Sequence, residues 1–134
     1  MTPRFLLDTH ILLRWFVEVR KLSHEQRSVL EACVRQAEPL AISARSLLEI
    51  AILVNEGDFK LRTGLDAFFK DLESNPLIQV LPITYRVASE VAAIGSGLRD
   101  PADRTIVATA RVHCLRLITS DQRIIESKLV PVVE

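Results

Sequence analysis

The sequence predicts an α/β fold in which a mainly parallel sheet is covered by helices on both faces. Short apolar runs of strand length recur along the chain, and longer segments with apolar residues at helical spacing separate them. Strands that alternate with helices form βαβ units, and the strands of such units run parallel. The 134 residues contain no internal repeat, low-complexity tract or linker, so residues 1–134 are expected to form a single domain.

Each element has its own signal in the sequence. The run FLL before Asp8 is continuous and apolar, as in a strand buried on both faces. Ser23 stands three residues before Gln26, which is the signature of a capping box, and Gly57 stands where a helix should end. The expected strands are 5–7, 39–43, 78–83, 115–120 and 130–133. The expected helices are 11–19, 22–37, 44–57, one between 57 and 76, 84–95 and one from 100, with a turn or short helix at 121–128.

The composition excludes several classes of function. Basic and acidic residues number 17 each, so no overall charge draws the chain to nucleic acid or to acidic membranes. An anionic substrate must therefore meet a local basic patch or a bound cation. Cys33 and Cys114 are far apart and lack metal-ligand spacing, so both are expected to be buried apolar residues in a reducing compartment. The first residues lack the apolar core of a signal peptide and no run reaches transmembrane length, which predicts a cytoplasmic protein with no membrane partner.

Four acidic residues are expected at one edge of the sheet. Asp8 ends the first strand, Asp121 ends the fourth, Asp103 lies in the first turn of the helix before the fourth strand, and Glu49 lies in the second turn of the helix after the second strand. In open parallel sheets, ligands bind beyond the carboxyl ends of the strands. Taken singly, Asp8 and Asp121 are well explained as helix caps, and Glu49 by an ion pair with Arg45 four residues before it.

The stretch RDPADRTIVATA assigns different tasks to its two aspartates. Asp100 precedes Pro101, a favoured first helical residue, so Asp100 is predicted to cap the helix. Asp103 precedes Ile106 by three positions and Val107 by four, so it lies on the apolar stripe that faces inward. Asp103 is therefore predicted to point toward the strand ends, where Asp8 also arrives.

Carboxylates that gather at a partly desolvated edge repel one another unless they are protonated or a cation neutralises them. A set of oxygen ligands without cysteine or suitably spaced histidine favours Mg²⁺ or Mn²⁺ over Zn²⁺. Divalent ions held by carboxylates lower the pKa of bound water and support in-line attack on phosphodiesters. The pattern therefore favours phosphodiester hydrolysis, which would leave a 3′-hydroxyl and a 5′-phosphate.

Four motifs, LLDTH, SARSLLEIAI, RDPADRTIVATA and LITSDQRI, together resemble the PIN domain, and most closely the VapC-type toxin ribonucleases of bacterial toxin–antitoxin pairs. The resemblance spans nearly the whole chain, with the motifs in family order. It implies a three-layer α/β/α sandwich and an endoribonuclease that depends on Mg²⁺ or Mn²⁺. It further implies homodimers, an RNA substrate and a cognate antitoxin that blocks the acidic site.

The resemblance also implies roles for individual residues. The residues that match the catalytic and metal-binding acids of the family are Asp8, Glu49, Asp103 and Asp121. Thr119 matches a residue that supports the metal site, and Asp100 adds charge beside it. One departure is His10, which stands where many members have Asn.

Arginines beside these motifs are candidates for binding backbone phosphates. Arg45 and Arg104 are the first candidates, and Arg99 and Arg123 are further ones. Each is equally well explained as an ordinary surface arginine. 

Two alternative functions remain open at this point. The first is an inactive PIN-like module that binds RNA or protein, although all four acids are present. The second is a doubly wound phosphatase or phosphotransferase. His10 stands where an aspartyl-phosphate enzyme has its second Asp, and no glycine-rich phosphate loop is found.

Overall fold

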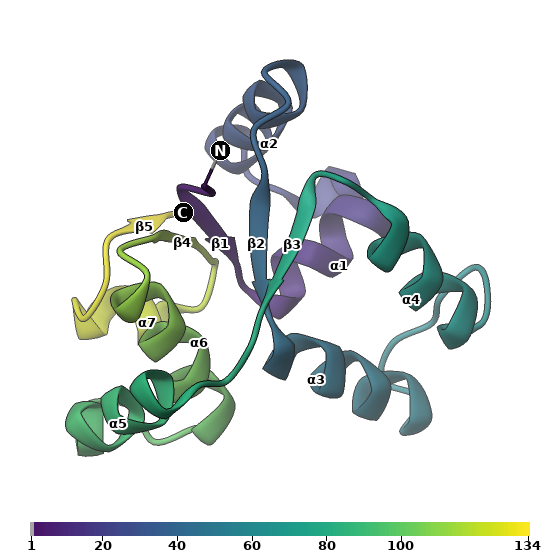
Figure 1. Ribbon diagram of the computed structural model, residues 1–134. Helices are drawn as coiled ribbons and strands as arrows, with labels where there is room; N and C mark the ends of the chain where they lie inside the picture. Colours follow the sequence, from purple (N-terminus) through teal and green to yellow (C-terminus); the bar gives the residue numbers. More distant parts are fainter. Residues whose placement is uncertain (1) are drawn as a thin grey trace.

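The computed structural model describes residues 2–134 and contains the predicted alternation of strands and helices (Figure 1). The strands are β1 (Phe5–Leu7), β2 (Leu40–Ser43), β3 (Ile78–Leu81), β4 (Arg116–Ile118) and β5 (Val132–Val133). The α-helices are α1 (Thr9–Val17), α2 (His24–Arg35), α3 (Ala44–Asn55), α4 (Leu65–Ser74), α5 (Tyr85–Ile94), α6 (Pro101–Val112) and α7 (Gln122–Ser127). Two short 3₁₀ helices are η1 (Val19–Lys21) and η2 (Gly95–Gly97).

The five strands form one parallel sheet in the order β3-β2-β1-β4-β5. The chain starts at the central strand, proceeds outward through β2 to β3, and then returns to the other side of β1 for β4 and β5. The strand order therefore reverses between β1 and β4. Such a switch point is where open α/β sheets bind ligands, beyond the carboxyl ends of the strands.

Helices cover both faces of this sheet, so the predicted three-layer α/β/α architecture is confirmed. Along β1, Phe5 and Leu7 pack into a core with α1, α2, α3 and α4, whereas Leu6 packs into a second core with α6 and α7. The same alternation places Ile118 in the first core and Leu117 in the second. Figure 1 shows α1, α3 and α4 on one side of the sheet and α5, α6 and α7 on the other. All three residues of β1 are buried because helices cover both of its faces.

The local signals in the sequence form the predicted caps. The Ser23 side chain accepts from the Gln26 backbone, and the Gln26 side chain accepts from the Ser23 backbone, so the capping box is confirmed. Gly57 follows the end of α3 with a φ of 77°, a left-handed conformation that glycine adopts without strain. The segment 121–128 forms the short helix α7.

One prediction about the cysteines is wrong. Cys33 is buried in the first core, but Cys114 is exposed. Cys114 lies in the turn between α6 and β4 and has a φ of 55°, and this turn faces solvent. None of the helices within residues 2–134 has both the length and the apolar character needed to cross a membrane.

Candidate active site

Asp8 and Asp121 follow adjacent strands, β1 and β4, and both cap the helix that comes next. Asp8 Oδ1 accepts from the Thr9 amide at 2.8 Å, and Asp121 Oδ1 accepts from the Arg123 amide at 2.9 Å. The simple explanation of each aspartate as a cap is therefore correct, but incomplete. Each cap uses one carboxylate oxygen, so the second oxygen of each residue is free for another partner.

Thr119 supplies that partner for Asp8. The Thr119 hydroxyl donates to Asp8 Oδ2 at 2.7 Å and accepts from the Asp121 amide at 3.0 Å. Both Asp8 and Thr119 are buried. Burial raises the pKa of Asp8, although the hydrogen bonds from Thr119 and Thr9 oppose the shift. Thr119 thus orients the Asp8 carboxylate and also holds the loop that carries Asp121.

Asp100 and Asp103 divide the tasks as the helical stripe predicts. Asp100 is exposed and caps α6, because its Oδ1 accepts from the Ala102 and Asp103 amides at 2.8 and 3.2 Å. The Asp103 side chain is only 14% exposed. Burial, followed by the charges of Asp100, Asp121 and Asp8, raises the pKa of Asp103 to about 7. Asp103 therefore lies close enough to the other aspartates for their charges to raise its pKa.

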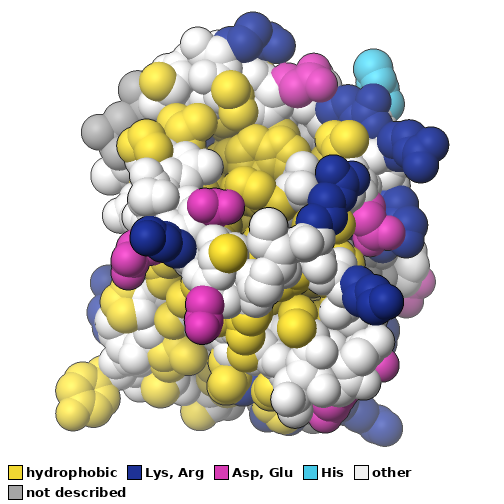
Figure 2. Space-filling view, turned by 90° about the vertical axis from the view of Figure 1, so that its right-hand side faces the viewer, with side chains coloured by type: hydrophobic (Ala, Val, Ile, Leu, Met, Phe, Trp, Pro, Cys, Tyr) yellow, Lys and Arg dark blue, Asp and Glu magenta, His cyan; other side chains and the backbone are white. Residues whose placement is uncertain are grey.

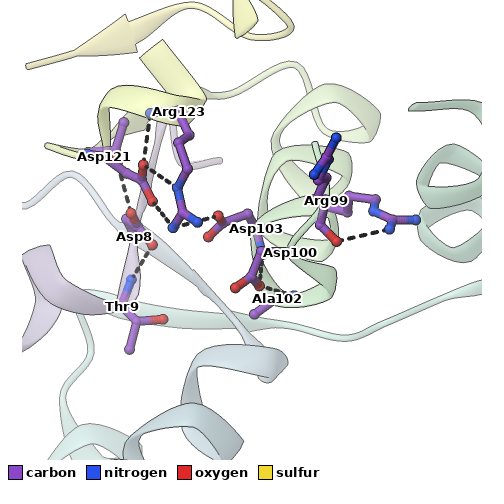
Figure 3. A network of polar contacts seen from close by, with 10 residues as sticks. Asp8, Thr9, Arg99, Asp100, Ala102, Asp103, Asp121 and Arg123 are labelled. Atoms are coloured by element: carbon purple, nitrogen blue, oxygen red, sulfur yellow. Dashed lines mark hydrogen bonds and ion pairs between the residues drawn. The ribbon is translucent and has the colours of Figure 1, made fainter. Parts of the chain in front are cut away.

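Arg123 is the cation that the structure brings to these acids (Figure 3). One guanidinium nitrogen, Nη2, lies 3.2 Å from Asp121 Oδ2 and 3.4 Å from Asp103 Oδ2. Burial acts to raise the pKa of Asp121, but hydrogen bonds from the Arg123 side chain and backbone outweigh it and hold that pKa below its usual range. One arginine thus bridges two of the predicted metal ligands.

Glu49 is held by residues that the sequence analysis did not single out. The Thr9 hydroxyl donates to Glu49 Oε1 at 2.5 Å and lies 2.8 Å from the Ser46 hydroxyl. Because the single Thr9 proton goes to Glu49, Ser46 donates to Thr9. Thr9 and Ser46 are fully buried. Their signal in the sequence is weak: Thr9 follows Asp8 directly, and Ser46 precedes Glu49 by one helical turn.

The candidate phosphate-binding arginines lie at the same edge. Among residues 2–134, Arg45 forms no ion pair with Glu49, and the buried Nε atoms of Arg45 and Arg104 have no hydrogen-bond partner. Arg104 Nη2 donates to the Arg99 carbonyl oxygen at 3.0 Å. Arg99 and Arg123 line a cleft of about 270 Å³ together with Asp100 and Asp103. Asp103 and these two arginines therefore share one open space at the sheet edge.

The acids fit a divalent cation by their chemistry. They supply oxygen donors alone, and burial is the main cause of the raised pKa values of Asp8 and Asp103, with the charges of Asp100, Asp121 and Asp8 adding to the shift at Asp103. In the side-chain positions observed, however, no three acidic, histidine or cysteine side chains within residues 2–134 converge closely enough to enclose one ion. Arg123 pairs with two of the acids and Thr9 holds a third. Shared coordination therefore requires side-chain rotation.

A larger cavity, of about 840 Å³, lies elsewhere. It is bounded by α5, the end of α6 and the segment before β5, and none of the four acids lines it. It opens at the amino ends of β4 and β5, away from the switch point.

Known proteins resemble this chain in sequence and in fold. Ribonuclease VapC22 of Mycobacterium tuberculosis is 33% identical over 120 residues, which are 89% of this chain and 88% of that protein. FitAcB from Neisseria gonorrhoeae has a TM-score of 0.71 at 24% identity, covering 97% of this chain and 96% of its own. VapBC2 from Rickettsia felis, solved with a DNA fragment from its promoter, has a TM-score of 0.70 at 13% identity, with 96% of each chain covered.

The two similar structures show the shared fold alone, whereas the sequence relative and the family profile also show the family. The profile described as PIN domain matches residues 5–128, which include all four candidate acids. On this match and on the 33% identity to Ribonuclease VapC22, the chain belongs to the PIN domain family.

Proposed function

We propose that this protein is a divalent-metal-dependent endoribonuclease and the toxin of a toxin–antitoxin pair. The observation that carries the proposal is the gathering of Asp8, Asp103 and Asp121 at the switch point of the sheet, where burial raises the pKa of Asp8 and Asp103. Neighbouring carboxylates with strongly perturbed pKa values are typical of catalytic metal sites. The relative named Ribonuclease VapC22 supports RNA as the substrate.

Asp8, Glu49, Asp103 and Asp121 are the proposed ligands and catalytic acids, and the ion is Mg²⁺ or Mn²⁺. Such an ion supplies Lewis acidity and a water of lowered pKa for attack on a phosphodiester. Thr119 keeps Asp8 oriented, and Thr9 keeps Glu49 oriented, through the hydrogen bonds described above. Asp100 acts in a supporting role: it fixes the start of α6 and adds negative charge near Asp103.

Arg45 and Arg104 are proposed to bind phosphates of the RNA backbone. The chain has no overall positive charge, so RNA has to be attracted locally. Neither guanidinium is neutralised by an ion pair within residues 2–134, which leaves their charge available. Contacts to phosphate position a substrate without reading its sequence.

The proposed partners are an antitoxin and a second copy of the chain. A similar structure is a toxin–antitoxin complex from Klebsiella pneumoniae, with a TM-score of 0.68, 23% identity, and 96% of this chain and 95% of that one covered. Leu48, Ile52, Val80 and Ile83 are each between 41% and 51% exposed. Figure 2 shows hydrophobic side chains gathered in a band down one face. Exposed apolar area of this kind favours protein association. We also propose that the protein acts in the cytoplasm, where RNA and these partners would meet it.

The decisive experiment compares cleavage of a mixed cellular RNA by the wild type, Asp8→Asn and Asp66→Asn. Asp66 is exposed in the first turn of α4, so its variant is a matched control for the loss of one carboxylate. Wild type and Asp66→Asn are expected to cleave with Mg²⁺ or Mn²⁺, and both EDTA and Asp8→Asn are expected to abolish cleavage. Cleavage that is insensitive to chelator, or equal in Asp8→Asn, would contradict the proposal.

The same experiment separates the alternatives. RNA binding without cleavage by any preparation would favour an inactive binding module. Release of phosphate from a small phosphomonoester, with RNA left intact, would favour a phosphatase.

We propose a single nuclease domain over residues 1–134, which predicts one cooperative unfolding transition. Two resolved transitions would contradict it.

A further inference from the structure

Arg123 stands out because it faces an excess of negative charge. The pKa of Asp103 responds to the charges of Asp100, Asp121 and Asp8, and Arg123 is the cation that opposes them. Its guanidinium touches both Asp103 and Asp121 through the same nitrogen, at 3.4 and 3.2 Å. A point of positive charge shared by two carboxylates is the arrangement that a bound cation would also create.

The side-chain polar contacts described for Arg123 are with Asp121 and Asp103. The side chain is 69% exposed, and its hydrogen bonds go to Asp121, at 3.4 Å from Nε and at 3.2 Å from Nη2. Ion pairs at a side chain this exposed are individually weak. Arg123 can therefore leave the acids at low energetic cost. It also lines the cleft that contains Arg99, so a released guanidinium would remain beside that space.

We propose that Arg123 is an internal counterion that neutralises Asp103 and Asp121 in the metal-free protein and is displaced when a divalent cation binds. This inference rests on the proposed function, because it assumes that these aspartates hold the ion. It accounts for two observations together: the acids lie at one edge, yet in the side-chain positions described for residues 2–134 they do not converge to enclose an ion. The displaced guanidinium then lies beside the ion, where a backbone phosphate would meet it.

A rival role makes the opposite prediction. If Arg123 serves to hold Asp121 ready for the ion, its removal weakens cation binding. If Arg123 competes with the ion, its removal strengthens binding. The sign of the change in affinity therefore decides between them, and no measurement of catalysis is needed.

The test is calorimetric titration of the full chain with Mn²⁺ alone. Arg123→Gln and Arg123→Met both remove the charge, and each is expected to bind Mn²⁺ about three- to tenfold more tightly than the wild type, as the loss of two weak ion pairs implies. Arg123→Lys keeps the charge but loses the second nitrogen that contacts Asp121, Nε, so it is expected to lie between them and the wild type.

Arg14→Gln is the matched control. Arg14 Nη1 donates to Ser120 Oγ at 3.3 Å, so this variant removes a positive charge from the same edge without breaking an ion pair to the acids. It is expected to change the affinity less than twofold, which measures the contribution of long-range charge. Unchanged or weaker binding by both neutral Arg123 variants would overturn the inference, as would an equal gain in Arg14→Gln.

Thermal unfolding supplies a second readout. In EDTA, Arg123→Gln is expected to unfold at a lower temperature than the wild type, because the acids lose their counterion. With saturating Mn²⁺ it is expected to gain more thermal stability than the wild type does. An Asp8→Asn variant that still binds Mn²⁺ as the wild type does would show that the proposed metal site is wrong, a different failure from an unchanged affinity in the Arg123 variants.

Discussion

The two ends of the central strands differ in how their carboxylates pair with arginines. At the amino end, Arg4 precedes β1 and Glu38 precedes β2, and they form a bidentate pair in which Arg4 Nη2 donates to Glu38 Oε2 at 2.8 Å. At the carboxyl end, Asp103 and Asp121 share one arginine, Arg123. Arg4 and Glu38 pair one to one, whereas two carboxylates share Arg123.

The pKa values record this difference. The hydrogen bond and the charge of Arg4 lower the pKa of Glu38, although its burial opposes the shift. Burial and neighbouring carboxylates raise the pKa of Asp103 to about 7. A lowered acid pKa means that the ionised group stabilises the fold, and a raised one means that ionisation destabilises it. The pair at the amino end therefore stabilises the fold, whereas ionisation of Asp103 at the carboxyl end opposes folding.

The largest expected effect is the loss of catalysis on substitution at the carboxyl end of the strands. Asp103→Asn removes a proposed metal ligand, so RNA cleavage at saturating Mn²⁺ should fall about a hundredfold or more. Glu38→Gln, at the amino end, should leave the rate per folded molecule unchanged. Initial rates, normalised to the folded fraction by circular dichroism, check both. Equal losses in the two variants would mean that the two ends do not differ in function.

The next effect is on stability: the same substitution that lowers activity is expected to raise the free energy of unfolding. The pKa of Asp103 is higher in the folded chain than in the unfolded chain, so its contribution is complete below about pH 4 and is lost as the pH rises through about 7. In EDTA, Asp103→Asn should therefore be more stable than the wild type at pH 8, by about 1–4 kcal/mol. The gap should close toward pH 4. Urea unfolding across this range measures it, and a gap independent of pH would contradict the assignment.

Glu38 should show the reverse behaviour. Its pKa is lowered in the folded chain, so its stabilisation is present above its ordinary value near 4.5 and fades as the pH falls through the folded value. Glu38→Gln should destabilise the protein at neutral pH, by less than the loss of a fully buried pair, because Arg4 loses a charged partner but is mostly exposed. The loss should shrink on acidification. The same urea series tests this, and a neutral effect at pH 7 would show that the pair does not stabilise the fold.

Periodicity in the sequence predicted the strands, their helices and the inward face of Asp103, because these features repeat along a few neighbouring residues. The Asp100 cap was predictable for the same reason, since Pro101 follows it. Contacts between distant segments were not. Arg4 and Glu38 are 34 positions apart, and Thr9 and Glu49 are 40 apart. The exposure of Cys114 depends on how a turn leaves α6, which apolar character alone does not reveal.

Thr9 offers the smallest predicted effect, and it tests whether such a long-range contact matters at the acid edge. Thr9→Val keeps the shape of the side chain but removes the hydroxyl that donates to Glu49. Groups that orient a ligand typically change metal affinity by 10- to 100-fold. Because Glu49 is one of four proposed ligands, the loss of Mn²⁺ affinity should be about tenfold or less. Thr9→Ser, which keeps the hydroxyl, should restore it.

Thr109→Val is the control for Thr9, because it removes a buried hydroxyl that donates only to the Thr105 carbonyl of its own helix. It should leave the affinity for Mn²⁺ unchanged. If Thr9→Val and Thr9→Ser weaken binding equally, the hydroxyl does not orient Glu49. If Thr9→Val weakens binding and Thr9→Ser does not, then the buried hydrogen bonds from Ser46 to Thr9 and from Thr9 to Glu49 contribute to metal binding, although neither hydroxyl is charged.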